Sequence, residues 1–130
     1  MVTEPKKTTL YFLRSQIRMG YPMKITSYQE VEAKEAEGSF KLKIRWLNND
    51  GSKKFAVRYI EIEPSGYSPH HSHPWEHEIF VLEGSGTAVG EKGMQSISVG
   101  NLISIPGEEI HQIKNTGKSA LKILCMIPKS

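Results

Sequence analysis

The sequence predicts an all-β domain, folded as an antiparallel sandwich or barrel. Between residues 40 and 46, apolar side chains alternate with Lys and Arg, which is the period of a half-buried strand. Turn-forming residues recur at short intervals, as in Asn48-Asn49-Asp50-Gly51 and Asn115-Thr116-Gly117-Lys118. Almost none of the chain has a helical period. Many short strands separated by glycine-rich turns are typical of antiparallel sandwiches and barrels.

The predicted elements follow in chain order. Ser27 and Glu30 have the spacing of a capping box, which predicts a short helical turn through Ala36, ended by Gly38. Pro64-Ser65-Gly66 is expected to end the second strand. The segments predicted as strands are 40–46, 55–62, 78–82, 87–89, 94–99, 101–105, 110–114 and 120–127.

The length of 130 residues fits one domain. Residues 1–22 are basic and polar without a clear period, so we interpret them as a loosely held, disordered N-terminal extension, with an upstream start codon as one explanation. The alternative is a swapped edge strand that packs on a partner subunit. Residues 23–130 are expected to form the barrel domain.

Composition excludes several classes of protein. The formal charge of +3 is spread over interspersed basic and acidic residues, so we expect no nucleic-acid partner. No apolar run approaches the length of a membrane span or a signal peptide, so we expect no membrane partner and no export. The single cysteine, Cys125, allows no intrachain disulfide, which fits a reducing compartment and a cytoplasmic location.

Four of the five histidines lie between residues 70 and 77. His71 and His73 are two residues apart on an extended segment, so their side chains point to the same face. His77 has the same parity, and Pro74 bends the backbone so that the three imidazoles can converge. Imidazole is the commonest protein ligand of transition metals. His70 has the opposite parity and is expected to point away.

His111 follows the turn that begins at Pro106 and can close this site if the barrel brings the strands together. On its own it would more often be a hydrogen-bonded core histidine, and the cluster near His71 could be an accidental histidine-rich loop.

These motifs resemble those of small single-domain cupins over about residues 24–128. The first cupin motif, Gly-x5-His-x-His-x3–4-Glu-x6-Gly, is matched at His71, His73 and Gly84, with Ser65 at its first glycine. The second motif, Gly-x5-Pro-x-Gly-x2-His-x3-Asn, is matched at Gly100, Pro106, His111 and Asn115, and Glu108 replaces its middle glycine. The resemblance implies an antiparallel double-stranded β-helix, or jelly-roll barrel.

The glutamate of the first motif falls on His77. The chain therefore resembles an all-histidine subgroup with the sequence His-Pro-Trp-Glu-His. This resemblance implies that one divalent transition metal is held by four ligands, which are His71, His73, His77 and His111. It favours manganese slightly, with iron, zinc, nickel or copper as alternatives. Glu78 points opposite to His77 along the strand and is expected to lie outside the metal site.

Parity also suggests a substrate pocket for a small molecule. Ile79, Ile113 and Cys125 are expected to face inward, although each could be plain core. Arg58 interrupts an apolar strand and could grip a carboxylate, or it could be an ordinary exposed arginine. Trp75 could wall the pocket or lie at a subunit interface.

Glu78, Phe80 and Leu82 have the opposite parity to His77 and lie on the other face of the strand. The resemblance to small cupins, which commonly pack such faces together, implies a homodimer.

The cupin fold does not fix the reaction. Our first hypothesis is an oxidoreductase of the dioxygenase type that acts on a small organic substrate. The alternatives are a non-redox isomerase or lyase for a sugar or keto acid, and a non-catalytic binding module. No residue stands out as a general base.

Overall fold

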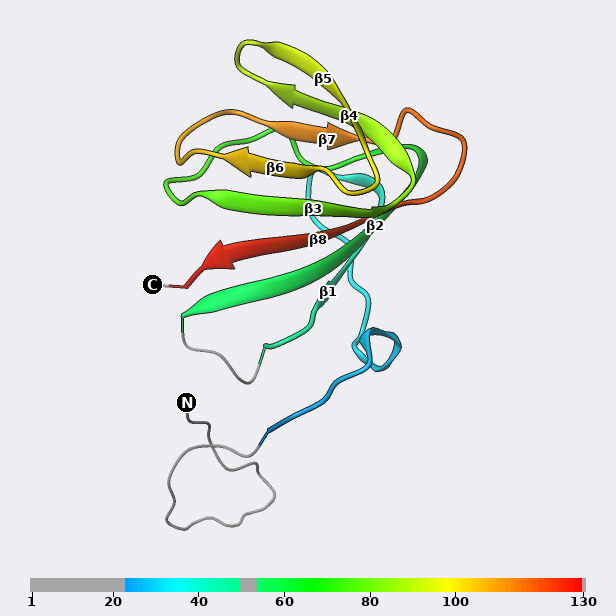
Figure 1. The fold of residues 1–130 in the computed structure, drawn as a ribbon, viewed down its shortest axis with the longest axis vertical. Coiled ribbons are helices and arrows are strands. Elements are labelled where there is room, and N and C mark those ends of the chain that lie inside the picture. Colours follow the sequence, from blue (N-terminus) through cyan, green and yellow to red (C-terminus); the bar gives the residue numbers. More distant parts are fainter. Residues whose placement is uncertain (1–22, 50–53, 130) are drawn as a thin grey trace.

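The structure of the protein is a computed structural model that describes residues 23–49 and 54–129. The predicted extension, residues 1–22, lies outside the described residues. Among the described residues, a single 3-10 turn, η1, precedes eight strands (Figure 1). The bounds are η1 Tyr28–Glu30, β1 Phe40–Trp46, β2 Phe55–Tyr67, β3 His77–Glu83, β4 Ser85–Gly90, β5 Gly93–Ser98, β6 Leu102–Ile105, β7 Gln112–Lys114 and β8 Leu121–Pro128.

The strands form one curled antiparallel sheet, which confirms the predicted all-β fold. Its order is β5-β4-β7-β2-β8-β3-β6, with β1 paired to the other edge of β2. Figure 1 shows β8 and β3 side by side and the β4–β5 hairpin at the far end of the sheet. Since sequence-distant strands become neighbours, the segments before β3 and before β7 come together, and these segments carry the histidines.

The helical turn predicted through Ala36 is wrong beyond its first residues. Ser27 makes no side-chain capping bond, and the chain is already extended at Val31. The guanidinium of Arg45 donates hydrogen bonds to the carbonyl oxygens of Tyr28 and Val31, both at 2.9 Å. These carbonyls are thereby held by β1, so tertiary contacts override the local helix signal.

The predicted end of the second strand at Pro64-Ser65-Gly66 is also wrong, because β2 continues to Tyr67. Ser65 has φ of 71°, and the register with β1 shifts near this point, so the strand bends through a bulge instead of ending. Beyond the bend, Tyr67 pairs with Lys114 of β7. The bend thus carries β2 from one part of the curled sheet to another.

The two non-glycine residues at cupin-motif glycine positions share one backbone conformation. Ser65 and Glu108 both have φ of 71°, in the left-handed region that favours glycine. The motif positions therefore report a backbone requirement that this chain meets with other residues.

Aliphatic side chains fill the inside of the curled sheet. Ile62, Val81 and Leu121 are fully buried there, and Asn115 lies among them with 2% of its surface exposed. The Asn115 side chain donates to the carbonyl oxygens of Ile62 at 2.8 Å and of Ser119 at 2.9 Å. Its own oxygen accepts from the backbone N–H of Gly117. This asparagine therefore ties the β7–β8 turn to β2.

Replacing Asn115 with alanine is expected to lower the free energy of unfolding by about 2–4 kcal/mol, because one buried and two partly buried backbone groups lose their partner. Urea unfolding of the two proteins measures this difference. Asn101→Ala is the control: its side-chain oxygen accepts one exposed bond from Ser98, and its loss should cost less than about 1 kcal/mol. Equal losses in both variants would contradict the role given to Asn115.

The outer face of the sheet carries Phe80 and Leu82, which are 38% and 41% exposed. Their orientation matches the parity argument, and the homodimer that we expect on this face stays a prediction. Within residues 23–49 and 54–129, no helix has the length and apolar character needed to cross a membrane.

Candidate metal centre

The backbone fixes two of the histidines directly against each other. His71 lies in the loop between β2 and β3, and His111 lies immediately before β7. His111 donates its backbone N–H to the carbonyl of His71 at 2.9 Å, and His71 returns a bond to the carbonyl of His111 at 3.2 Å. This reciprocal pair forms an isolated antiparallel bridge. The two side chains are therefore positioned by main-chain bonds.

The turn before His111 also holds the His73 segment. The backbone N–H of Glu108 donates to the carbonyl of His73 at 2.6 Å. A Cβ on Gly107 would collide with the carbonyl oxygen of Pro74, so only glycine lets the two loops approach this closely. The second motif thus supplies His111, and its turn also holds the segment that carries His73 of the first motif.

Hydrogen bonds also set which ring nitrogens of two histidines point inward. Nδ1 of His73 is 2.9 Å from the carbonyl oxygen of Trp75, and Nδ1 of His111 is 2.9 Å from that of Glu109. A carbonyl oxygen can only accept, so each Nδ1 carries the proton and each Nε2 keeps its lone pair. Both Nε2 atoms are buried without a hydrogen-bond partner.

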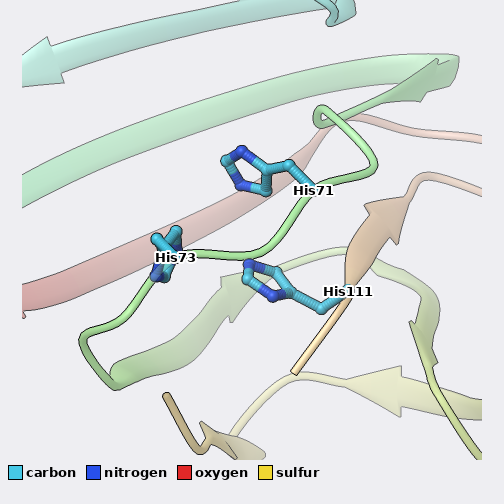
Figure 2. Close-up of side chains that lie close together, drawn as sticks. All are labelled: His71, His73 and His111. Carbon is cyan, nitrogen blue, oxygen red and sulfur yellow. The ribbon is translucent and has the colours of Figure 1, made fainter. Parts of the chain in front are cut away.

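Candidate ligand atoms of His71, His73 and His111 all lie within 4.8 Å of one another. Figure 2 shows the three imidazoles around a common space, two from the β2–β3 loop and one from the segment entering β7. His71 is exposed, His73 is half-buried and His111 is buried, so the group faces solvent on one side. Buried lone pairs on oriented imidazoles fit a transition metal ion.

His77 is next to this group but is not one of the three. Its ring centroid lies 4.6 Å from that of His73 and 5.3 Å from that of His111. However, its Nε2 is 2.5 Å from Nη2 of Arg58. Arginine only donates, so this nitrogen accepts and the proton lies on Nδ1, which is buried without a partner. The four-histidine ligand set therefore stays a prediction.

Burial favours the neutral form of His71, His77 and His111. It lowers the pKa of His77 to about 3, with the nearby positive charge of Arg58 as the second cause. Burial also lowers the pKa of His71 and of His111. Since a metal ion binds neutral imidazole, the environment favours the binding form over a wide pH range.

A cavity of about 210 Å³ lies behind the histidines. All five side chains predicted for the substrate pocket line it, and their role toward a substrate stays a prediction. They are Arg58, Trp75, Ile79, Ile113 and Cys125. Sequence reasoning missed Trp46, which also lines the cavity. Trp46 pairs directly with Arg58 across β1 and β2, a register that the sequence alone does not provide.

Glu78 and His70 lie away from the histidine group. The Glu78 carboxylate accepts a hydrogen bond from Ser104 Oγ at 2.6 Å, on the outer side of β3. The His70 side chain is exposed.

The sequence matches the family model described as "Cupin domain" over residues 58–127. The chain belongs to the cupin family. Among solved structures, this cupin is similar to the polyketide cyclase RemF from Streptomyces resistomycificus, with a TM-score of 0.78 and 31% identity. That similarity covers 84% of this chain and 81% of RemF.

Two curated proteins also resemble this cupin. A 1-methylthio-D-xylulose 5-phosphate methylsulfurylase from Rhodospirillum rubrum is 32% identical over 71 residues, covering 55% of this chain and 46% of that protein. Auxin-binding protein 1 from Arabidopsis thaliana is 31% identical over 88 residues, covering 61% and 44%. The cupin therefore spans less than half the length of these relatives.

Trp75 packs against His73, one of the candidate metal ligands. Its ring stacks on His73 with centroids 4.7 Å apart and planes 8° from parallel. We expect Trp75→Ala to weaken zinc affinity by about three- to tenfold, because aromatic stacking of this kind contributes about 0.5–1.5 kcal/mol. Competition titration against a zinc-binding dye measures this change. Trp75→Phe keeps a stacking ring and should lose less zinc affinity. Equal zinc affinity of Trp75→Ala and the unmodified protein would show that the stacking does not contribute to metal binding.

Proposed function

We propose that this cupin is a metal-dependent enzyme that acts on a small carbonyl compound without changing its oxidation state. The observation that carries this proposal is the convergence of three imidazoles at the mouth of an apolar cavity. Four neutral ligands, with His77 as the fourth, would make it a member of the all-histidine subgroup. A bound divalent ion would act there as a Lewis acid that polarises a carbonyl oxygen.

The similarity to RemF supports a carbonyl substrate, because RemF is described as a polyketide cyclase. Polyketide chains carry closely spaced carbonyl groups, and two such oxygens can chelate one ion. The aliphatic walls formed by Ile44, Ile79 and Ile123 suit an apolar body and exclude water from it.

The described lining of the cavity has no carboxylate that could act as a general base, which restricts the class of substrate further. No Asp or Glu lines it among the described residues. Burial and the neighbouring Arg58 hold the pKa of His77 at about 3, so this imidazole is a weak proton acceptor. Substrates whose C–H protons are already labile, such as 1,3-dicarbonyl compounds, need the least help from a base.

A dioxygenase is the second candidate function. Imidazole donors bind iron, copper and manganese as well as zinc, so the ligand chemistry equally supports a redox metal such as the manganese that we favour. Substrate-dependent oxygen uptake would distinguish this candidate. The match to Auxin-binding protein 1 supports a third outcome, tight binding of a small organic molecule without turnover.

The test uses 1-phenylbutane-1,3-dione with protein loaded with zinc, manganese or iron, under nitrogen and under air. Deuterium exchange at the central methylene, followed by NMR, reports enolisation. Exchange accelerated by the zinc form under nitrogen, and lost in His111→Ala, would support the proposal. Turnover that needs both oxygen and a redox metal would favour the dioxygenase. Binding without exchange or oxygen uptake would leave the binding module.

A further inference from the structure

Arg58 stands in the interior of the sheet among cavity-lining neighbours. In register, Trp46 of β1 pairs with Arg58 of β2, Arg58 pairs with Cys125 of β8, and Cys125 pairs with Ile79 of β3. Side chains of paired residues project from the same face of a sheet. All four line the cavity behind the histidines. The permanent positive charge of Arg58 is therefore part of the cavity wall.

None of the groups that contact this guanidinium carries a negative charge. Nη2 donates to Nε2 of His77 at 2.5 Å and to Sγ of Cys125 at 2.8 Å. The guanidinium carbon lies 5.2 Å from the centroid of the Trp46 ring. Burial raises the pKa of the Cys125 thiol, so it stays protonated and neutral near pH 7. The imidazole of His77 carries no negative charge in either of its usual protonation states.

The guanidinium also has unused donor capacity. Its Nε is buried and has no hydrogen-bond partner. Among the described residues, no Asp or Glu lines the cavity and none forms an ion pair with Arg58. Arg58 is half-buried, and a charge partly removed from water without a counter-charge is unfavourable, so its position in the cavity wall is best explained by an anion that arrives from outside.

The cavity limits what the rest of that anion can be. Apart from the histidines, Arg58, Ser68 and Cys125, its lining is aliphatic or aromatic. Its volume is about 210 Å³. For scale, a cavity of about 150 Å³ holds one benzene molecule. A single ring with a short substituent therefore fits, and the exposed edge at His71 leaves room for a longer ligand to extend outward.

We infer that Arg58 is an anion-binding residue of this cavity and selects ligands that carry a carboxylate or enolate oxygen on a flat, apolar body. The inference rests on the proposed function, because it places the substrate in the same cavity. Binding of the anion by Arg58 itself requires no metal ion. The proposed function and the anion-binding role of Arg58 can therefore be tested separately.

The test compares benzoate with benzamide, which has nearly the same shape but no charge. Binding to metal-free protein at pH 8 is followed by tryptophan fluorescence, since both tryptophans line the cavity. Calorimetry provides a second readout. We expect benzoate to bind at least about tenfold more tightly than benzamide, as charge-assisted bonds are about twice as strong as neutral ones.

Variants on neighbouring strands separate Arg58 from general charge. Arg58→Met should reduce the preference to within about twofold, whereas Arg58→Lys should keep part of it. Lys43→Met removes one positive charge from the exposed side of β1 and should leave the preference intact. Arg58→Gln replaces Arg58→Met if the methionine variant does not fold. An unchanged preference in the uncharged variants, or no preference in the unmodified protein, would overturn the inference.

A parallel zinc titration separates the role of Arg58 from the proposed metal-dependent function. Zinc binding at the histidines without any benzoate preference would overturn only the role of Arg58. A benzoate preference that depends on Arg58, in a protein that binds no metal, would support that role and overturn the proposed function.

Discussion

Replacing His111 with alanine is expected to weaken zinc binding by at least about 100-fold, because changes to groups that merely support a metal ligand already cost 10- to 100-fold. His111 is the most buried of the three grouped histidines, and its Nε2 lone pair is oriented by the bond from Nδ1 to the Glu109 carbonyl. The backbone bonds to His71 do not involve the imidazole and should persist. Isothermal titration with zinc, manganese and iron measures the loss for each ion.

His70→Ala is the matched control for this substitution. His70 is exposed, adjoins His71 and stands outside the grouped ligand atoms. Its removal should change affinity by less than about twofold. If His70→Ala and His111→Ala lost the same affinity, the metal would be binding adventitiously to the histidine-rich loop.

The metal-free protein is expected to lose stability as the pH falls below about 6.5. His77 has a pKa of about 3 in the folded protein against an ordinary value of 6.5, so the unfolded chain binds more protons between these values. Its contribution to stability is therefore complete above pH 6.5 and declines toward pH 3. The slope for one such histidine reaches at most about 1.4 kcal/mol per pH unit. The pKa values of His71 and His111 are lowered in the same direction.

Urea unfolding at several pH values, with His77→Gln as the comparison, isolates this effect. Glutamine can accept the bond from Arg58 but does not titrate, so the difference between the two stability curves should flatten above pH 6.5 and change steadily below it. Carboxylates titrate in both proteins and cancel in the difference. Parallel curves over the whole range would show that His77 does not resist protonation.

Periodicity predicted the strands, because alternation of inward and outward side chains is a local property. The segment predicted from Phe40 to Trp46 has the same bounds as β1, and Leu42 and Ile44 are buried as the alternation predicts, whereas Phe40 is exposed. The capping-box signal at Ser27 failed because Arg45, far away in sequence, takes the carbonyls that a helix would use. The bend at Ser65 was missed because Pro64-Ser65-Gly66 is also typical of a strand end, and only the pairing beyond it shows that β2 continues to Tyr67.

The details of the site depend on register, which alternation does not fix. Sequence reasoning left Arg58 open between the inside and the outside, and the pairing with Trp46 and Cys125 places it inside. The contact of Arg58 with His77 could not be foreseen, because it joins strands β2 and β3 across β8. For the same reason, the spacing of the histidines could not separate His77 from the other three.

The reciprocal hydrogen bonds between His71 and His111 join main-chain atoms only. They therefore do not depend on which metal-binding side chain stands at position 71. Any side chain that suits an extended backbone can occupy position 71 without disturbing the bridge. His71→Glu, for example, would present two nitrogens and one oxygen from an unchanged main chain, a set that accommodates harder ions such as Mg²⁺ and Mn²⁺ better. A single substitution can thus change which metal ion such a barrel prefers, so this site can be altered by evolution or by engineering without rebuilding the fold.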